Sequence, residues 1–497
     1  MEHASTKSSL KLDSRSVTIL ALAAALSLGV YLAVSALVSH LGFPLDDSWI
    51  HQTYARNLAL RGEWAFMPGV PSNGDTSPLW VLFLAPGFLL GLGPYIWTYL
   101  LGYLLLFALA CILEISLRQF SESYSSRWPL AGLFICFEWH FAWAAGAGME
   151  TLLHALLVTV ILTRLSAPAP RPLTLGLLTG LTVWVRPDGL TLIGPALFTL
   201  LLIDSSGWRV KAQRVFMFGL GVLVLLLPYF LFNLSLSAHP FPNTFYAKQS
   251  EYTDWQMKPI IIRLGILLLQ FFNGPALILL FGVIVWVRAF VRARQWGSVS
   301  ALIWFAGYLS IYLLRLPPYQ NGRYIMPAMP IFFLWGLLGL VKYYSQAATR
   351  PRARTVRGAG ATRNLVLVAV LFFWGLGVRS YAREVAYIEN NMVLIARWAD
   401  ANLPPDALIA VHDIGAMGFF DQHALLDLAG LTSPEVIPFM RDQARLAVYL
   451  RQQGVDYLIV FPSTYPELIL QAPLVFSAPD ALAVPMDAEK LSVYFWR

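Results

Sequence analysis

Two adjacent carboxylates, Asp46 and Asp47, open a polar segment that follows the first long apolar stretch of the chain. The segment covers residues 45–80 and reads LDDSWIHQTYARNLALRGEWAFMPGVPSNGDTSPLW. A carboxylate can take the proton of an attacking hydroxyl group, and one carboxylate is enough for this task. Adjacent acids repel, so one of them should have a raised pKa or share a cation. We predict that Asp46 is a general base oriented by Asp47, with helix capping by both as the alternative.

A helix is predicted directly after the two aspartates. Asp47 and Ser48 are suitable N-cap residues, and Gly62 is placed to end the helix after about residue 60. Apolar residues recur at every fourth position on one face, while His51 and Arg56 point elsewhere. This pattern favours a helix in the membrane interface, with His51 and Arg56 as candidate substrate-binding residues.

Charged residues also interrupt an apolar region in the segment WVRPDG, residues 184–189. Charges at membrane depth are costly, so they usually face a cavity or pair with each other. Arg186 and Asp188 could therefore form a mutual pair at a helix break or line a substrate site. Glu150, near the mouth of another apolar stretch, could partner Arg186, face the interface or contact substrate.

Two further polar segments carry groups that suit an anion. Tyr246 and Lys248 lie in residues 239–248, where Lys248 could meet a phosphate as a point charge. The alternative is an interfacial aromatic belt with a snorkelling lysine. Arg323 and Tyr324 lie in residues 317–324, and an arginine suits bidentate contact with phosphate.

The order of motifs in the first polar segment resembles a known family. Asp-Asp, a Tyr-Ala-Arg-Asn-Leu helix, Pro-Gly and Gly-x-Thr-Ser-Pro-Leu-Trp follow one another within residues 46–80. This pattern resembles the first external loop of GT-C membrane glycosyltransferases and is similar to that of mycobacterial-type arabinofuranosyltransferases. The Arg-Pro-Asp-Gly at 186–189 and the Arg-Tyr at 323–324, which precedes a proline, also resemble segments of such enzymes.

The resemblance implies an inverting transfer of a sugar from a polyprenyl-phosphate donor to a glycan or lipid acceptor of the cell envelope, with a loop aspartate as base. Pentose as the sugar is implied only by the resemblance, so a hexosyl- or pentosyltransferase is expected. The alternatives are a polytopic transporter, a flippase of lipid-linked oligosaccharides, or a ligase that uses a diphosphate-linked donor. Transporters tend to carry internal repeats, and none is evident in this sequence.

No cofactor is required by the motifs. Hard oxygen ligands suit Mg²⁺ or Mn²⁺, so a divalent cation at the aspartate pair is left open. The two cysteines, Cys111 and Cys136, both lie in apolar stretches, which excludes a disulfide framework and a cysteine-based zinc site.

The elements that must position these residues are membrane helices. Hydrophobic residues make up 57% of the chain, charged residues 13%, and the mean hydropathy is +0.61. A spanning helix needs roughly 20 mainly apolar residues, and twelve apolar stretches are candidates. They include residues 17–38, 78–92, 128–146 and 260–287. We expect a polytopic α-helical membrane protein with a GT-C-like fold.

Basic clusters set the expected orientation. Arg-rich segments at residues 288–294 and 350–363 should be cytoplasmic by the positive-inside rule, so the net charge of +7 does not imply nucleic-acid binding. The N-terminus is then cytoplasmic and the C-terminus outside, in the cytoplasmic (inner) membrane. This arrangement requires an odd number of spans, about 11, with a short or re-entrant helix near residues 78–92.

The tail has a different character from the rest of the chain. Residues after 379 hold 14 of the 28 acids but 7 of the 35 basic residues. Helices at 385–402 and 445–453 alternate with strands at 407–411, 425–428, 457–461 and 491–496, which predicts a small α/β domain with a largely parallel sheet. We therefore divide the chain into a transmembrane catalytic module, residues 1–379, and an extracytoplasmic α/β domain, residues 380–497.

One polar segment of this domain follows a strand. His412 and Asp413 stand where a parallel sheet usually carries a site, and we name both as candidate substrate-binding residues. Plain turn chemistry at Asp413 is the alternative.

Overall fold

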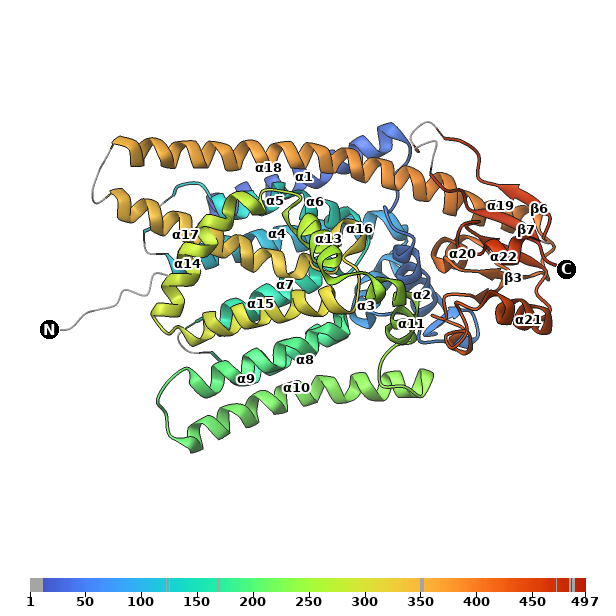
Figure 1. Ribbon diagram of the computed structural model, residues 1–497, viewed down its shortest axis with the longest axis horizontal. Coiled ribbons are helices and arrows are strands. Elements are labelled where there is room, and N and C mark those ends of the chain that lie inside the picture. Colours follow the sequence, from blue (N-terminus) through green and yellow to red (C-terminus); the bar gives the residue numbers. More distant parts are fainter. Residues whose placement is uncertain are drawn as a thin grey trace.

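Long, roughly parallel helices form a bundle, and a small domain with a five-stranded sheet lies at one end of it (Figure 1). The computed structural model describes residues 12–497 except 122, 125, 168–169, 349–352, 471, 482–483 and 485–487. The first polar segment and helix α11 lie between the bundle and the small domain (Figure 1).

Apolar composition accounts for the bundle. Within the described residues, six helices are long and apolar enough to cross a membrane. The long helices are α1 (Ser14–Val38), α4 (Gly93–Phe120), α10 (Trp208–Ser237), α15 (Trp296–Leu314), α17 (Met329–Ala348) and α18 (Ala353–Tyr387). Shorter apolar helices are α3 (Pro78–Leu89), α7 (Thr151–Leu165), α8 (Pro172–Val185) and α9 (Ile193–Leu202), the last preceded by the 3₁₀ turn η1 (Pro187–Leu192). The short helix expected near residues 78–92 is present as α3, whereas the count of about 11 spans stays a prediction.

Two stretches expected to be continuous helices are broken. Residues 128–146 form α5 (Leu130–Phe137) and α6 (Trp139–Gly146), and Glu138 between them accepts the His140 N–H at 3.0 Å. Residues 260–287 form α13 (Ile260–Phe272) and α14 (Ala276–Arg292), bent by 96°. The bend falls at Asn-Gly-Pro, residues 273–275, where proline has no N–H to continue a helix.

The Arg-rich segment at 350–363 is another difference. It was expected to be a loop, but α18 already begins at Ala353. Arg350 and Arg352 lie outside the described residues. Arginine has a high helix propensity, so a basic segment is compatible with either state and hydropathy alone does not distinguish them.

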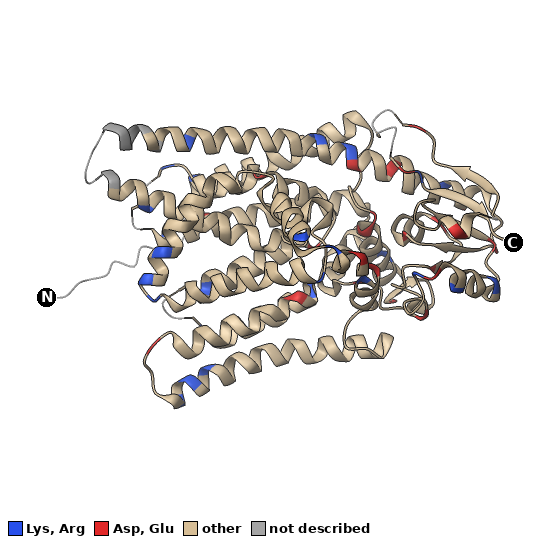
Figure 2. Ribbon diagram, in the orientation of Figure 1, with Lys and Arg blue, Asp and Glu red and all other residues tan. Residues whose placement is uncertain are grey.

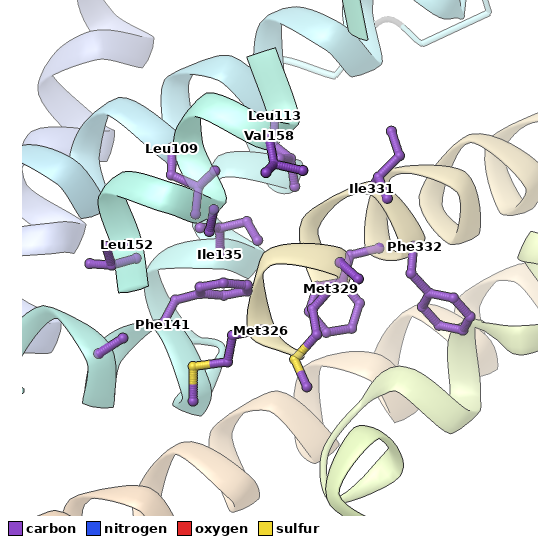
Figure 3. Packing of buried hydrophobic residues seen from close by; sticks show 14 of the residues in the cluster. Leu109, Leu113, Ile135, Phe141, Leu152, Val158, Met326, Met329, Ile331 and Phe332 are labelled. Atoms are coloured by element: carbon purple, nitrogen blue, oxygen red, sulfur yellow. The ribbon is translucent and has the colours of Figure 1, made fainter. Parts of the chain in front are cut away.

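The centre of the bundle is a closely packed apolar core formed by α4, α5, α6, α7 and α17 (Figure 3). Ile135, Phe141 and Met329 are all fully buried there. Close helix contact depends on a small residue at Gly102, because a Cβ at this position would lie 1.9 Å from the Ala145 carbonyl oxygen.

The small domain has a mixed sheet. Its strands are β3 (Leu408–Val411), β4 (Ala424–Asp427), β5 (Tyr457–Val460), β6 (Leu474–Ser477) and β7 (Ser492–Phe495), in the order β4-β3-β5-β7-β6. Strands β3, β4 and β5 are parallel, while β7 is antiparallel to both β5 and β6. The prediction of a largely parallel sheet is therefore wrong for two of the four strand pairs. Strand β6 was not predicted, and β7 runs antiparallel to β5.

Helices complete the small domain and its connection to the bundle. They are a π-helical turn (Ile388–Val393), α19 (Leu394–Asn402), α20 (Ile414–Phe420), η4 (Pro434–Val436), α21 (Gln443–Gln453) and α22 (Pro466–Ile469). Helix α18 runs without a break through residue 379, so the division of the chain at 379/380 falls inside a helix and stays a prediction.

Candidate active site

Helix α2 (Asp47–Arg61) carries the two aspartates at its start. It ends as expected at Gly62, whose φ of 70° lies in the left-handed region. The expected capping by Asp47 and Ser48 is wrong, because no side chain caps the helix and the Ser48 hydroxyl instead donates to the Ala147 carbonyl at 2.6 Å. The helix is followed by a small hairpin of β1 (Ala65–Met67) and β2 (Val70–Pro71).

Asp46 faces the small domain. Its carboxylate accepts the backbone N–H groups of Gly415 at 2.7 Å and Ala416 at 2.8 Å, at the start of α20. The residue is 9% exposed, and burial together with the negative charge of Asp413 raises the pKa of its carboxyl group to about 7. Both oxygens of Asp46 are therefore engaged in a contact between the bundle and the small domain.

Asp47 faces a cavity. Burial alone would raise its pKa, but the charges of Arg323 and Lys248 outweigh this effect and lower the pKa to about 2. Its carboxylate accepts a hydrogen bond from Arg323, and its side chain stays 34% exposed. Of the two aspartates, Asp47 is thus the accessible, ionised one.

The cavity beside Asp47 lies where the bundle, the first polar segment and the small domain meet. Its volume is about 30 Å³. It is lined by Asp47, Ile50, His51, Gly74, Thr76, Met149, Glu150, Arg186, Thr244, Lys248, Arg323 and Leu431. This space holds one or two water molecules, so a larger ligand requires some of the lining residues to move apart.

Three cations surround the ring of Tyr324. Lys248 of α11 (Asn243–Glu251) donates to the Tyr324 hydroxyl at 2.8 Å, and Arg323 donates to it at 2.9 Å. The Arg186 guanidinium carbon lies 5.1 Å from the ring centroid. The Nε and Nη1 groups of Arg323 are buried and have no hydrogen-bond partner within the described residues, which leaves donors available to an anion.

A tight turn presents Arg323 to the cavity. Gln320, Asn321 and Gly322, in the short α16 (Tyr319–Gly322), have φ values of 55°, 58° and 70°. The Asn321 amide donates to both oxygens of Glu384 on α18 at 3.0 Å. Consecutive left-handed residues cost free energy and persist when their surroundings hold them, as Glu384 does here.

A chain of buried ion pairs supports the other wall of the cavity. His51 Nδ1 lies 2.6 Å from Asp75, and its Nε2 lies 3.2 Å from Glu150, which also accepts from Arg186 at 2.7 Å. Burial would lower the pKa of His51, but Asp75 and Glu150 raise it to about 10. Burial would raise the pKa of Glu150, but its ion pairs with His51 and Arg186 hold the pKa well below its usual range.

Both interpretations of Arg186 and Asp188 are partly realised. The Arg186 Nε lies 3.3 Å from both oxygens of Asp188, so the two form the expected pair at the break after α8. Arg186 also lines the cavity. Asp188 accepts hydrogen bonds from Tyr308 at 3.0 Å and Tyr312 at 2.6 Å, and therefore fixes Arg186 from behind.

The chain is similar to two structures of ArnT from Cupriavidus metallidurans. One is bound to undecaprenyl phosphate, with 16% identity, a TM-score of 0.57, and coverage of 96% of this chain and 98% of that one. The other is in the apo state, with 17% identity, a TM-score of 0.59, and coverage of 97% and 98%.

The chain has a GT-C fold. The expected fold class is thus confirmed: a multi-pass membrane protein of mainly apolar helices with a small C-terminal sheet domain. At this level of identity the likeness concerns the fold alone. Residues 380–494 match a family described as a domain of unknown function (DUF8728), and no curated protein sequence matches the chain.

Within this GT-C fold, several candidate residues lie away from the cavity. The Arg56 guanidinium donates to the carbonyl groups of Phe419 at 2.7 Å and Gly418 at 3.1 Å. The Tyr246 ring packs 5.0 Å from His239 and does not line the cavity. Neither side chain is brought next to Asp47.

The small domain approaches the site through the residues after β3. His412 Nδ1 lies 2.8 Å from the Tyr465 hydroxyl. Burial and the negative charge of Asp47 raise the pKa of Asp413 above its ordinary value. Among the described residues of the small domain, Leu431 lines the cavity, whereas His412 and Asp413 do not.

Three acids near the site were not selected from the sequence. Asp75 lies in the Gly-x-Thr-Ser-Pro motif, which was recognised as a pattern without a role for its variable position. The pKa of Glu251 is raised by burial against the opposing charges of His412 and Lys248. Glu384 is a lone acid after 129 residues without one, 255–383, and this isolation was a signal that could have identified it.

The aspartate pair does not fit a bridging cation in this arrangement. The oxygens of Asp46 accept backbone N–H groups, and Asp47 accepts from Arg323, so the two carboxylates offer no common metal site. Among the residues that the structure describes, no group of three or more His, Cys, Asp or Glu side chains could hold a metal ion. The Mg²⁺ or Mn²⁺ expectation stays untested.

Proposed function

We propose that this protein transfers a sugar from a polyprenyl-phosphate donor to a hydroxyl group of a cell-envelope glycan or lipid, with inversion at the anomeric carbon. One observation carries the proposal. A carboxylate, Asp47, shares a cavity with Arg323, Lys248 and Arg186, which together can hold a phosphate monoester.

The chemistry assigns a different task to each group. Asp47 accepts the proton of the acceptor hydroxyl group, and the oxygen of that hydroxyl group attacks the anomeric carbon. The bond between that carbon and the phosphate oxygen breaks, and the lipid phosphate leaves with both electrons. Arg323 and Lys248 stabilise the charge that develops on the leaving phosphate.

The Asp47–Arg323 pair links donor binding to activation of the base. A bound phosphate competes with Asp47 for Arg323 and Lys248. Because these cations hold the pKa of Asp47 at about 2, their engagement by phosphate raises its basicity. Asp47 then becomes a competent base only when the donor is in place.

The roles of the two aspartates are reversed relative to the sequence-based prediction. Each oxygen of Asp46 accepts one backbone N–H group, from Gly415 or Ala416, so we assign Asp46 the role of positioning the small domain beside the cavity. His412 and Asp413 of that domain are proposed to contact the acceptor.

The GT-C fold supports this assignment, because an ArnT structure of the same fold is bound to undecaprenyl phosphate. We propose the outer face of the cytoplasmic membrane as the place of reaction, with the N-terminus cytoplasmic and the small domain outside. A pentose is the proposed sugar through the resemblance to arabinofuranosyltransferases, and hexoses are the alternative.

The test is a reconstituted transfer reaction. Purified protein in proteoliposomes is given polyprenyl-monophosphate and polyprenyl-diphosphate pentoses and hexoses with an envelope-lipid extract, and products are identified by mass spectrometry. The proposal expects transfer from monophosphate donors and inversion in the product. Transfer only from diphosphate donors would indicate a ligase, and lipid-linked sugar crossing the bilayer without transfer would indicate a flippase.

A further inference from the structure

An apolar groove lies at the end of the bundle opposite the candidate active site. It runs between α5, α17 and α18 and has a volume of about 640 Å³, within the usual range of ligand pockets. Helix α17 connects the two regions: it begins just after Tyr324, and Tyr344 at the polar end of the groove lies about 20 Å further along, at 1.5 Å per residue.

The groove opens sideways to the bilayer. Its walls are almost wholly apolar, and Leu367 and Leu371 on α18 are 56% and 49% exposed at its rim. Leu130 on α5 is also exposed at the opposite rim. In a membrane these side chains meet lipid, so an occupant reaches the groove from the bilayer and presents a hydrocarbon chain.

Polar groups gather at one end of the groove only. The Tyr344 hydroxyl and the Thr362 hydroxyl share a hydrogen bond of 2.6 Å. Arg363 follows Thr362, lines the groove and is exposed, and it has no ion-pair or hydrogen-bond partner within the described residues. An unpaired arginine above an apolar slot fits a lipid with a negatively charged headgroup.

Two walls of the groove, α17 and α18, belong to a stretch rich in basic residues, whereas at the third wall Glu114 accepts the backbone N–H groups of Ala131 and Gly132 at the start of α5. The chain contains no Asp or Glu between residues 255 and 383, and this stretch supplies α13 to α17 and most of α18. The first three turns of α18 include arginines at 354, 357 and 363. Lys and Arg also mark the ends of the helices farthest from the small domain (Figure 2).

We propose that this groove binds an anionic phospholipid of the leaflet at the basic end of the bundle. One acyl chain lies between α5, α17 and α18, and the headgroup phosphate contacts Arg363. This site is separate from the proposed donor site and does not depend on the proposed reaction.

The test uses the full-length protein in nanodiscs of equal phosphatidylglycerol and phosphatidylcholine, released into mild detergent and analysed by native mass spectrometry. The expected result is one retained phosphatidylglycerol. Arg363→Gln should lower the retained fraction at least fivefold. Arg292→Gln, at an exposed arginine on α14 outside the groove, should leave it unchanged.

A second variant separates the chain from the headgroup. Val366→Phe narrows the groove while keeping Arg363, and should also reduce lipid retention. Equal retention of phosphatidylcholine and phosphatidylglycerol, or equal behaviour of Arg363→Gln and Arg292→Gln, would overturn the proposal. Retention of polyprenyl phosphate in place of phospholipid would also overturn it. Elution as a single folded species in size-exclusion chromatography checks each variant.

Discussion

At the scale of single residues, two neighbouring aspartates have opposite surroundings. Successive residues at a helix start point in directions about 100° apart, so Asp46 meets backbone N–H groups and Asp47 meets cations. The pair drew attention in the sequence because two acids between apolar stretches are unusual, and its role in catalysis stays a prediction. The sequence alone does not show what surrounds each aspartate, because their hydrogen-bond partners lie 276 to 370 positions away.

Tyr324 gives the first prediction. Its hydroxyl accepts from both Lys248 and Arg323 and so holds the two cations together. Tyr324→Phe removes both hydrogen bonds and should raise the KM for the polyprenyl-phosphate donor by roughly 10- to 150-fold with a smaller change in kcat, since a hydrogen bond to a charged group contributes about 1.5–3 kcal/mol.

Steady-state kinetics in proteoliposomes measure this effect. Tyr246→Phe is the matched control, because Tyr246 lies outside the cavity and should leave KM unchanged. A Tyr324→Phe enzyme with the same KM as the wild type would contradict the role given to the hydroxyl group.

His51 gives a prediction about pH. Its pKa is about 10 in the folded protein against an ordinary value of 6.5, so the folded state binds its proton more tightly than the unfolded state. The stabilisation is complete below pH 6.5 and is lost as the pH rises through 10. We expect the melting temperature in detergent to fall over this window, and His51→Gln to flatten the fall. A wild-type and variant pair with parallel pH profiles would disprove this account of His51.

At the scale of elements, α2 holds both ends of α20. Asp46 accepts N–H groups at the start of α20, and Arg56 donates to the carbonyl groups of Gly418 and Phe419 near its end. Acceptor oxygens at the N-terminus of a helix and a cationic donor at its C-terminus both satisfy backbone groups that the helix leaves unpaired. Arg56, expected to bind substrate, thus has a structural contact that fixes the small domain over the cavity.

The close approach of these helices gives a third prediction. A Cβ at Gly415 would lie 2.1 Å from the backbone oxygen of Asp46 and 2.6 Å from its carboxylate. Gly415→Ala should therefore destabilise the protein by about 1–3 kcal/mol and reduce transfer. Gly307→Ala is the control, since a Cβ there has no neighbour within 4 Å. Thermal unfolding measures both variants. An equal decrease of the melting temperature in Gly415→Ala and Gly307→Ala would contradict this packing.

Hydrophobic pattern predicted most elements and missed their interruptions. The strands at 407–411 and 457–461 correspond to β3 and β5 because they are short apolar runs, buried except at their first residue. Strand β6 was missed because its first two residues are exposed, so burial leaves no clear pattern in it. The breaks at Glu138 and at Asn273 to Pro275 depend on local hydrogen bonding, which hydropathy does not record.

At the scale of the whole molecule, the site is assembled from five distant parts of the chain. Asp47, Glu150, Arg186, Lys248 and Arg323 meet at one end of the bundle. Each was selected as a polar interruption of an apolar region, but their meeting follows from helix packing. The Asn321–Glu384 contact joins α16 to α18, and no local pattern indicated it.

The orientation of the molecule in the membrane gives the fourth prediction. Arg445 on α21 and Arg292 on α14 are exposed at opposite ends of the molecule (Figure 1). The two native cysteines, Cys111 on α4 and Cys136 on α5, lie within the bundle. A water-soluble reagent should therefore react with an introduced surface cysteine in preference to them. A membrane-impermeant maleimide should label the Arg445→Cys variant in intact cells. It should label the Arg292→Cys variant only after the cells are permeabilised. The reverse pattern would place the aspartates and the cavity on the cytoplasmic side.

The most direct measurement compares the two aspartates. Initial rates of sugar transfer from a polyprenyl-monophosphate donor are measured in proteoliposomes for the wild type, Asp47→Asn and Asp46→Asn, with melting temperatures alongside. Loss of a general base costs about 10²–10⁴-fold in rate. Asp47→Asn should therefore lose at least 100-fold with an unchanged fold, while Asp46→Asn should keep activity within tenfold. Retained transfer by Asp47→Asn, with activity lost only in Asp46→Asn, would contradict the assignment of Asp47 as the base.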